Sequence, residues 1–374
     1  MRLALVVHDF DPGLGQGRYG IELARRLAVR HRVEIVSSRF AVEREPGWEY
    51  RPVRAWRRTS LLTVFSFLAG ATWAMRGRAY DVIHAQGLTC WNADVITAHV
   101  CNAARRLAQR PATVRERVFA GLVHPVEAAF YRQRRATHAI AVSARVAEEL
   151  ARHYGWRRPM SVIHHGIDTA MFRPPVDDGE RGRCRARYGV GAGERMWLFV
   201  GEATKGLATA IEVLRDFPGV RLVAVTRSAA GWYAARAEEL GVAGRLALRG
   251  PEVEVARAYR AADVFVYPSR YDAFGMVVAE AMASGLPVVV GRDIGAAEWV
   301  EDGVNGLKVD AGDGVAWREA LKRLESDAGF GRRLGEAARR TAMSYSWDSR
   351  AAATEAVYEA VARLRVGDAG GRGP

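Results

Sequence analysis

Residues 268–290 carry the chemistry that the sequence suggests most clearly. An apolar strand is expected to end in a loop that contains Asp272 and Gly275, and a helix is expected from about Met276. The backbone amides of Gly275, Met276 and Val277 would then lie without partners at the helix start, where the helix dipole favours anions. This pattern is suited to binding a diphosphate.

Glu280 lies one turn further into the expected helix, among apolar residues. A carboxylate there carries a desolvation cost unless it is paired or hydrogen-bonded, and two ribose hydroxyls would satisfy it. Asp272 in the loop could bind hydroxyls of a second sugar. The alternative is that Asp272 caps the helix and Glu280 pairs with an arginine. The residues alone leave both interpretations open.

A glycine-rich turn, residues 11–17, follows the first expected strand. Gly15 and Gly17 would let backbone amides approach a phosphate at a helix start, although the spacing differs from G-x-G-x-x-G. A tight turn that needs positive φ explains the glycines equally well. Asp9 and Asp11 offer two carboxylates for a metal, but no further ligand cluster stands nearby, so a loop with one helix cap is favoured.

These residues need a scaffold, and the alternation of short apolar runs and amphipathic stretches predicts two parallel sheets covered by helices. The first half has expected strands at 3–7, 32–37, 80–84, 94–99, 136–142 and 161–164, and expected helices at 17–29 and 144–154. Two of these strands end in His84 and His99, where parallel sheets present ligand-binding groups. After a proline- and acid-rich break at 172–182, further strands are expected at 196–200, 221–225, 246–248, 264–267 and 287–290, followed by helices at 330–343 and 347–364.

Composition narrows the class of protein. The 374 residues are 49% hydrophobic and 26% charged, which favours sizeable cores over disorder. Three widely spaced cysteines give neither a disulfide framework nor a C-x-x-C metal site, which favours a reducing compartment. The apolar stretch 61–75 is shorter than the ~20 residues that cross a bilayer, and the first residues do not resemble a signal peptide. We expect a cytoplasmic protein whose net charge of +13 favours an anionic partner.

The second half of the chain resembles the retaining, GT-B fold glycosyltransferases of family 4. Their hallmark is a pair of glutamates separated by seven residues in a loop and helix, and here Asp272 and Glu280 match it, with Asp in place of the first Glu. Other motifs follow in the family's order over nearly the whole chain: Gly15–Gly17, Asp81–His84, Ile96–His99, Ala141–Ser143, Ile163–Asp168, Phe199–Gly201, Lys205–Gly206, Ala261–Asp263, Ile294–Glu298 and Asp302–Gly303.

The resemblance implies two Rossmann-like α/β domains that face each other across a cleft. Residues 1–172 would form an N-terminal acceptor-side domain, with 347–365 packing back on it, and residues 180–345 a nucleotide-sugar-binding domain. The implied activity is transfer of a sugar, with retention, from a nucleotide-sugar donor to a lipid-linked, polysaccharide (lipopolysaccharide-type) or small-molecule acceptor. It implies no cofactor and no metal.

The resemblance also assigns site residues position by position. Glu280 would hold the nucleotide ribose, and Asp272 would hold donor-sugar hydroxyls. Lys205 would neutralise the diphosphate, and His99 would lie beside the transferred sugar, so that His99, Lys205 and Asp272 form the expected catalytic group. Further donor contacts are expected from Gly15, Gln16, Gly201, Phe274, Gly275 and Met276.

The sequence departs from the family pattern at two positions. The arginine that usually precedes the lysine is absent, because this segment contains Glu202 and no arginine, and Arg227 or Arg270 could supply the missing charge. Asp272 is one methylene shorter than the usual Glu, which leaves the identity of the donor sugar open.

Two tracts, residues 51–78 and 105–135, combine arginines with aromatic and aliphatic residues. Such tracts suit shallow attachment to anionic lipid, at ~1 kcal/mol for each Lys or Arg near the surface. The second tract is similar to the membrane-facing region of lipopolysaccharide-core glucosyltransferases, which implies a peripheral position on the inner face of the plasma membrane. Ordinary helices with solvated arginines are the alternative. A rival of another class, a non-catalytic basic protein that binds nucleic acid or membrane, has no recognisable nucleic-acid motif here, so no nucleic-acid partner is expected.

Overall fold

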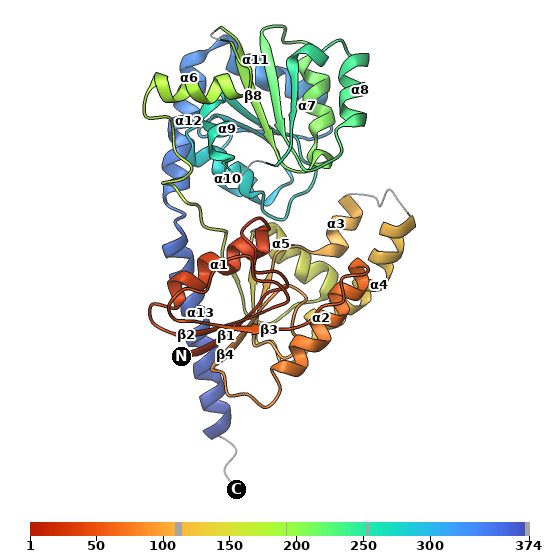
Figure 1. Ribbon diagram of the computed structural model, residues 1–374, viewed down its shortest axis with the longest axis vertical. Helices are drawn as coiled ribbons and strands as arrows, with labels where there is room; N and C mark the ends of the chain where they lie inside the picture. Colours follow the sequence, from red (N-terminus) through yellow and green to blue (C-terminus); the bar gives the residue numbers. More distant parts are fainter. Residues whose placement is uncertain (109–113, 192, 252–253, 371–374) are drawn as a thin grey trace. The chain divides into compact units, whose positions relative to one another are not determined.

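The computed structural model describes residues 1–108, 114–191, 193–251 and 254–370. The chain forms two compact units, one made of Met1–Gly166 with Trp347–Pro374 and the other of Ile167–Ser346. Each unit is built on one parallel β-sheet with helices in its crossover connections (Figure 1). The predicted class, two Rossmann-like α/β domains, is therefore confirmed.

The first unit contains a seven-stranded sheet in the order β3-β2-β1-β4-β5-β6-β7. Its strands are β1 (Arg2–Val6), β2 (Arg32–Ser37), β3 (Trp48–Pro52), β4 (Val82–Gln86), β5 (Val95–Ala98), β6 (His138–Ala141) and β7 (Met160–Val162). The central strands β4 and β5 are buried along their whole length, as expected for a parallel sheet with helices on both faces.

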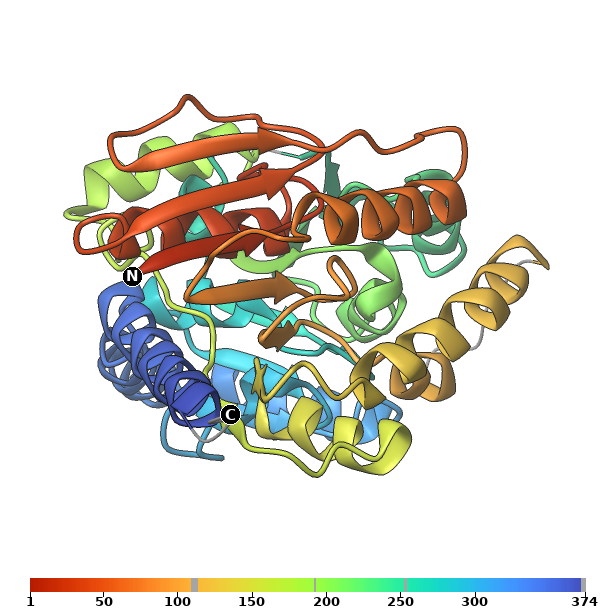
Figure 2. The same cartoon turned by 90° about the horizontal axis from the view of Figure 1, so that it is seen from below.

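The helices of the first unit are α1 (Gly15–Leu27), α2 (Ser60–Ala74), α3 (Asn102–Ala108), α4 (Val114–Arg132), α5 (Ala144–Glu149), the π-helical turn η1 (Leu150–Tyr154) and α13 (Trp347–Gly370). The helices predicted at 17–29, 144–154 and 347–364 are present in this unit, and three further helices, α2, α3 and α4, were not predicted with bounds. Figure 2 shows α3 and α4 extending away from the sheet. None of the helices in the described ranges is both long and apolar enough to span a membrane.

Helix α13 completes the first unit although it comes from the end of the chain. It packs against α1 and β4, and the Tyr358 hydroxyl contacts Nδ1 of buried His84. The Glu355 carboxylate lies 2.7 Å from Nε2 of His31 and is also paired with Arg30. These contacts explain how a terminal segment can belong to a unit whose other residues lie some 180 positions earlier.

The second unit contains a six-stranded parallel sheet in the order β10-β9-β8-β11-β12-β13. Its strands are β8 (Arg195–Val200), β9 (Val220–Val225), β10 (Leu246–Arg249), β11 (Val264–Tyr267), β12 (Val288–Gly291) and β13 (Leu307–Val309). Its helices are α6 (Asp178–Arg187), η2 (Ala203–Lys205), α7 (Leu207–Leu214), α8 (Gly231–Glu239), η3 (Ala243–Arg245), α9 (Ala256–Ala261), α10 (Met276–Ala283), η4 (Gly295–Trp299), α11 (Gly314–Ser326) and α12 (Ala328–Met343).

The sequence pattern missed two edge strands. β3 alternates apolar and charged residues and pairs only with β2, and β13 has three residues and pairs only with β12. Each forms by pairing with a neighbouring strand. It was not predicted because its own sequence lacks a continuous apolar run. Helix α1 also begins at Gly15, two residues before the predicted start.

The tether between α13 and the first unit can be tested by replacing Glu355 with Gln. We expect Glu355→Gln to lower the free energy of unfolding by about 1–3 kcal/mol, because two charge-assisted contacts of a nearly buried carboxylate are weakened. Urea denaturation followed by circular dichroism measures the change. The matched control is Glu359→Gln on the same helix, whose exposed ion pair contributes little. Equal effects of the two changes would contradict the tether.

Candidate functional site

In each unit the strand order reverses between the first and fourth strands, β1 and β4 in one and β8 and β11 in the other. At such a switch point the loops after the two strands separate, and they leave a crevice at the carboxyl ends where α/β sheets bind ligands. In the second unit these loops are residues 201–206 and 268–275. All the residues predicted for that half lie in them or in α10.

Lys205 and Asp272 come from the two sides of this switch point and meet. Nζ of Lys205 lies 3.2 Å from Oδ2 of Asp272, and it donates a hydrogen bond of 2.9 Å to the carbonyl oxygen of Tyr271. The Tyr267 hydroxyl donates to the same Oδ2 at 2.8 Å. Burial, with the Asp272 charge beside it, raises the pKa of Tyr267 well above its ordinary value, so the phenol keeps its proton. The carboxylate is therefore held by one cation and one hydroxyl.

Glycines allow the loops to approach this closely. Gly206 has φ +101°, and a Cβ there would lie 2.2 Å from the carbonyl oxygen of Pro268. Gly201, at the end of β8, also has a positive φ, of +136°. A residue with a side chain at position 206 would push the Lys205 turn away from the Asp272 loop, so Gly206 is needed to bring the pair together.

Helix α10 starts directly after the Asp272 loop. Gly275 is its N-cap with φ +95°, and no side chain caps the helix. Asp272 therefore does not cap it, and this part of the alternative interpretation is wrong. Phe274 packs edge-on against Trp299, 5.3 Å between ring centroids, and its carbonyl accepts from the Ala296 amide. The Val278 amide donates to the Gly275 carbonyl at 2.9 Å, whereas the amides of Gly275, Met276 and Val277 make no hydrogen bond to a described residue and can serve a negatively charged ligand.

Glu280 is buried in α10 with 5% of its surface exposed. The Tyr259 hydroxyl, from α9, donates to its Oε2 at 2.8 Å. A carboxylate accepts several hydrogen bonds, so this contact leaves capacity for ligand hydroxyls. Neither Tyr259 nor Tyr267 was predicted as a site residue. Tyr259 lies in α9 and Tyr267 in the predicted strand β11, but neither belongs to a recognisable motif.

The two arginines suggested as replacements for the missing family arginine lie in different places. Arg270 follows β11, but its Nη2 lies 3.8 Å from the position of a Cβ on Gly312, beyond edge strand β13. Arg227 is exposed after β9, and the next residue, Ser228, accepts a hydrogen bond of 2.9 Å from the Ala203 amide in the Lys205 turn. Arg227 therefore directly precedes the residue that contacts the Lys205 turn, whereas the end of the Arg270 side chain lies near Gly312.

In the first unit, His99 follows β5 next to the β4 end. In the orientation that the structure gives the Gln86 amide, Nε2 of His99 donates to Oε1 of Gln86 at 2.8 Å. This bond fixes the neutral tautomer and leaves Nδ1 as an acceptor that makes no hydrogen bond to any described residue. Burial, with His84 nearby, lowers the pKa of His99 to about 3. Gln86 was missed in the sequence, although it ends the strand that contains His84.

The glycine-rich turn lies beside the same strand end. Helix α1 starts at Gly15 and has no side-chain cap, and Gly15 has open space around the position of a Cβ. Nε2 of Gln16 lies 3.6 Å from the position of a Cβ on Gly87, directly after Gln86. Gly17 is sterically required, because a Cβ there would lie 2.3 Å from the Asp11 carbonyl. Gly15, Gln16, Gln86 and His99 thus gather at the switch point of the first sheet.

Two other histidines of the first unit, His84 and His165, are buried and packed against other side chains. His84 contacts the Tyr358 hydroxyl through Nδ1 and the Thr97 hydroxyl through Nε2, 2.7 Å away, so both ring nitrogens have partners. His165 is buried with its ring centroid 5.2 Å from that of Tyr19 and 5.5 Å from that of His99. Burial lowers the pKa of each, to about 3 for His84. Both histidines lie near His99 and contribute to the packing of the first unit.

The carboxylates considered for a metal have other partners. Asp9 is paired with Arg57 and lies 3.0 Å from Nδ1 of His8, and Asp11 accepts from the Gly13 amide at 2.9 Å. Within the described ranges, no group of three or more His, Cys, Asp or Glu is arranged to hold a metal ion.

The two-sheet fold and these site loops match known families. Residues 181–341 match the glycosyl transferases group 1 family, and residues 14–171 match glycosyltransferase family 4. The chain belongs to these glycosyltransferases.

Two curated relatives are D-inositol 3-phosphate glycosyltransferases. That of Streptomyces avermitilis is 31% identical over 92% of this chain and 83% of its own length. That of Xylanimonas cellulosilytica is 36% identical over 62% of this chain, and the match spans 58% of the relative, little more than half its length.

Two solved structures share the fold. Sucrose-phosphate synthase from Thermosynechococcus elongatus has a TM-score of 0.81 and 22% identity, covering 96% of this chain and 99% of its own. WaaG, a glycosyltransferase involved in lipopolysaccharide biosynthesis, has a TM-score of 0.80 and 20% identity over the same shares. These similarities confirm the predicted family and the GT-B architecture.

The buried histidines predict how stability depends on pH. Their folded-state pKa values lie below the ordinary 6.5, so between about pH 6.5 and pH 3 the unfolded chain binds protons that the folded chain excludes. Their contribution is complete above pH 6.5 and is lost as the pH falls. We expect His84→Gln to reduce the slope of unfolding free energy against pH by up to about 1.4 kcal/mol per unit in this window, measured by denaturation at several pH values.

The slope of the wild type is compared with that of the His84→Gln variant because Glu127 changes the unfolding free energy with pH in the opposite direction. Burial raises the pKa of Glu127 from 4.5 to about 7, so it stabilises the fold as the pH drops through that range. This contribution is common to both proteins and cancels in the difference. An unchanged slope in the His84 variant would show that His84 is protonated in the folded protein.

Proposed function

We propose that this protein is a retaining glycosyltransferase that takes a sugar from a nucleotide-sugar donor bound to its second unit. The observation that carries the proposal is the meeting of Lys205 and Asp272 at the switch point, directly before the uncapped start of α10. A cation, a carboxylate and a set of helix amides lie there within one pair of loops. This combination is suited to a diphosphate attached to a polar sugar.

The proposed chemistry follows from the charges that develop during transfer. Breaking the bond between the anomeric carbon and the phosphate oxygen leaves positive charge on the sugar ring and negative charge on the diphosphate. Lys205 and the amides at Gly275 and Met276 stabilise the diphosphate, because they are positioned before the reaction. In the proposed front-face departure, the leaving phosphate accepts the proton of the acceptor hydroxyl, so Asp272 binds sugar hydroxyls and does not act as a nucleophile.

The other proposed contacts extend along the donor. Glu280 accepts hydrogen bonds from the ribose hydroxyls while Tyr259 holds its second oxygen. Arg227 is the better of the two candidates for the missing diphosphate counter-charge, because the next residue, Ser228, is bonded to the Lys205 turn. In the first unit, Nδ1 of His99 accepts from a hydroxyl of the transferred sugar, and Gly15 and Gln16 line the same end of the sheet.

For the acceptor, we propose the class that the sequence implied: a lipid-linked glycan, a polysaccharide or a small molecule. The names of the curated relatives add phosphorylated polyols to the small molecules, and a net charge of +13 favours such anions. A screen of UDP-, GDP- and ADP-sugars against these acceptor classes would identify the pair. No metal or other cofactor is part of the proposal.

Substitution of Glu280 and Lys205 tests the donor site. We expect Glu280→Ala to weaken nucleotide binding roughly 10- to 100-fold, because it removes charge-assisted hydrogen bonds to the ribose. Lys205→Ala should lower kcat by roughly 100-fold with a smaller change in donor affinity, because its charge acts mostly on the leaving group. Calorimetry gives the affinity, and donor hydrolysis or transfer gives kcat.

The exposed changes Glu239→Ala and Lys322→Ala are the matched controls. Wild-type affinity in Glu280→Ala together with wild-type turnover in Lys205→Ala would overturn the site. The rival class, a non-catalytic basic protein, would be supported if no sugar nucleotide bound or turned over while RNA or DNA bound in a salt-sensitive way.

We also propose that the first unit attaches to anionic membranes through helices α2, α3 and α4, here called the α2–α4 surface. Its exposed apolar residues are Leu62, Trp73, Leu107, Val114, Val118 and Leu122, and Trp56 lies just before α2. α4 contacts both other helices, so these residues belong to one region. Exposed arginines flank them at 105, 106 and 117, whereas residues 109–113, including Arg110, lie outside the described ranges. An apolar face with cationic flanks suits shallow insertion.

Charge reversal at Arg105, Arg106 and Arg117 tests this attachment. Replacing all three with Glu should weaken binding to vesicles of equimolar phosphatidylcholine and phosphatidylglycerol by roughly 100-fold or more, at ~1 kcal/mol per charge. Hydrolysis of a soluble donor should be unchanged. The control carries the same charge change on exposed arginines of the second unit, Arg183, Arg187 and Arg332. Vesicle binding in a sedimentation assay that is equal for both variants would discard the membrane proposal.

A further inference from the structure

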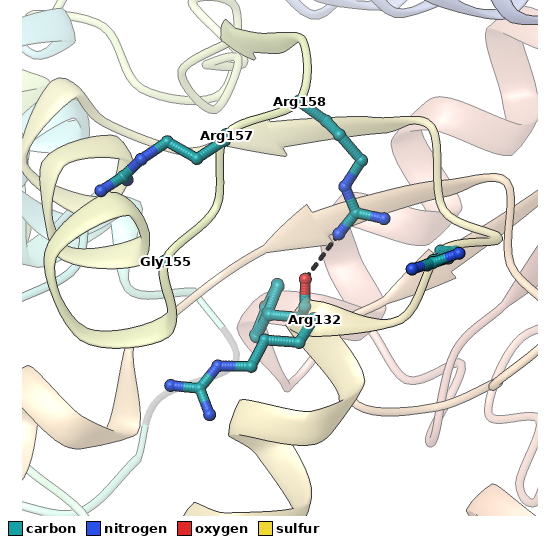
Figure 3. A pocket seen from close by; sticks show the side chains of 6 residues that line it. Arg132, Gly155, Arg157 and Arg158 are labelled. Atoms are coloured by element: carbon teal, nitrogen blue, oxygen red, sulfur yellow. Dashed lines mark hydrogen bonds between the residues drawn. The ribbon is translucent and has the colours of Figure 1, made fainter.

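The first unit contains a hollow of about 240 Å³ whose lining is dominated by arginine. It is lined by Tyr131, Arg132, Arg134, Gly155, Arg157 and Arg158. Figure 3 shows Arg157 and Arg158 extending from the segment after Gly155, and Arg132 from the end of a neighbouring helix. We call it the arginine pocket.

The arginine pocket lies at the edge of the sheet opposite to His99. Arg158 comes two residues before β7 and Arg134 four residues before β6, so the pocket is at the amino ends of these strands. His99 and Gln16 lie at the carboxyl ends of the same parallel sheet. The pocket is therefore separate from the donor and sugar contacts proposed above.

The four arginines have no acidic partner among the residues that the structure describes. None of them forms an ion pair with a carboxylate in the described part of the chain. A second hollow, of about 230 Å³ in the other unit, shows the contrasting case, because Arg236 there is paired with Glu212 at 3.1 Å and Glu239 at 2.9 Å. Like charges gathered without a counter-charge repel one another, and an anion in the pocket would relieve this repulsion.

Backbone carbonyls hold three of the guanidinium groups in place without neutralising them. Arg158 donates to the carbonyl oxygens of Tyr131 at 2.6 Å and Ala136 at 2.7 Å, and it stacks over the Trp156 ring at 4.0 Å. It acts as a cap for the end of α4.

The other arginines keep donors available. Nε of Arg132 donates to the Tyr154 carbonyl at 3.3 Å, and Nη1 of Arg157 donates to the Ala151 carbonyl at 3.1 Å. The two terminal nitrogens of Arg132, and Nε and Nη2 of Arg157, make no hydrogen bond to a described residue, and neither does Arg134. Positioned guanidinium donors of this kind match the oxygens of a phosphate, which they can bind in pairs.

We propose that the arginine pocket is a second ligand site of this protein, which binds a phosphate group. Its volume is below the roughly 300 Å³ at which sites for drug-sized ligands begin, which fits a phosphate with a small part of the molecule that carries it. The group can belong to a soluble phosphate compound or to a lipid headgroup. Both present the same oxygens to Arg132, Arg134 and Arg157.

The test replaces Arg132, Arg134 and Arg157 together with Gln in the full chain and leaves the structural Arg158 unchanged. The first part of the test measures the affinity for free inorganic phosphate by calorimetric titration. Acetate at equal ionic strength is the reference anion. The triple variant should bind phosphate at least tenfold more weakly, whereas the control triple Arg183→Gln, Arg187→Gln and Arg332→Gln should match the wild type. Lys205→Ala should keep this phosphate site, which separates it from the donor site.

The second arm uses vesicles of equimolar phosphatidylcholine and phosphatidylglycerol. Vesicle binding that the triple variant loses and the control triple keeps, without binding of free phosphate, identifies a lipid headgroup as the source. Arg134→Gln alone removes no hydrogen bond or ion pair to a described residue, so a partial loss of binding in this single variant would not be explained by misfolding. Affinities of the triple variant within twofold of the wild type in both arms would overturn the proposal, as would a wild type that prefers neither phosphate nor the vesicles.

Discussion

Close contact between backbone segments at the carboxyl edge of the second sheet is the constraint on which the candidate site depends. A Cβ on Gly206, Gly291 or Gly295 would lie 2.1 to 2.2 Å from a carbonyl oxygen of the loop 268–275. Gly206 follows β8, Gly291 is the last residue of β12, and Gly295 comes after β12. The loop is therefore in close contact with backbone segments on both sides. This contact fixes where Asp272 and the start of α10 lie, because side chains at these glycines would force the segments apart.

The same contact explains why a shortened carboxylate still has a defined place. Asp272 reaches both Lys205 and the Tyr267 hydroxyl although it is one methylene shorter than the family's Glu. In the proposed function this carboxylate binds hydroxyls of the donor sugar, so the shorter side chain is the position at which we expect a change of donor-sugar preference.

The sequence predicted the strands well where apolar runs are continuous. It predicted them less well where a strand forms mainly because it pairs with an adjacent strand. β11 was predicted with its observed bounds, whereas β3 and β13 depend on pairing with adjacent strands and have no such run. Lys205 and Asp272 were each predicted, but 67 positions separate them, and only the order of β8 and β11 brings them together.

The hydrogen-bonding partners of the site residues were not predictable for the same reason. Tyr259 reaches Glu280 from α9, and Gln86 fixes the tautomer of His99 from the neighbouring strand. Tyrosine and glutamine at such positions are common and carry no spacing signal. Their roles come from packing between elements, which a pattern along the chain does not contain.

The discontinuity of the first unit has a consequence for how the protein is made. Residues 167–346 are continuous in sequence, whereas Met1–Gly166 lacks α13 until residues 347–370 have also been synthesised. During synthesis, β4 would therefore wait with His84 exposed on a face that α13 later covers, while the inserted unit is already able to fold. The first unit is then completed by the docking of one helix onto its sheet, so loss of residues 347–370 would damage the unit that is synthesised first.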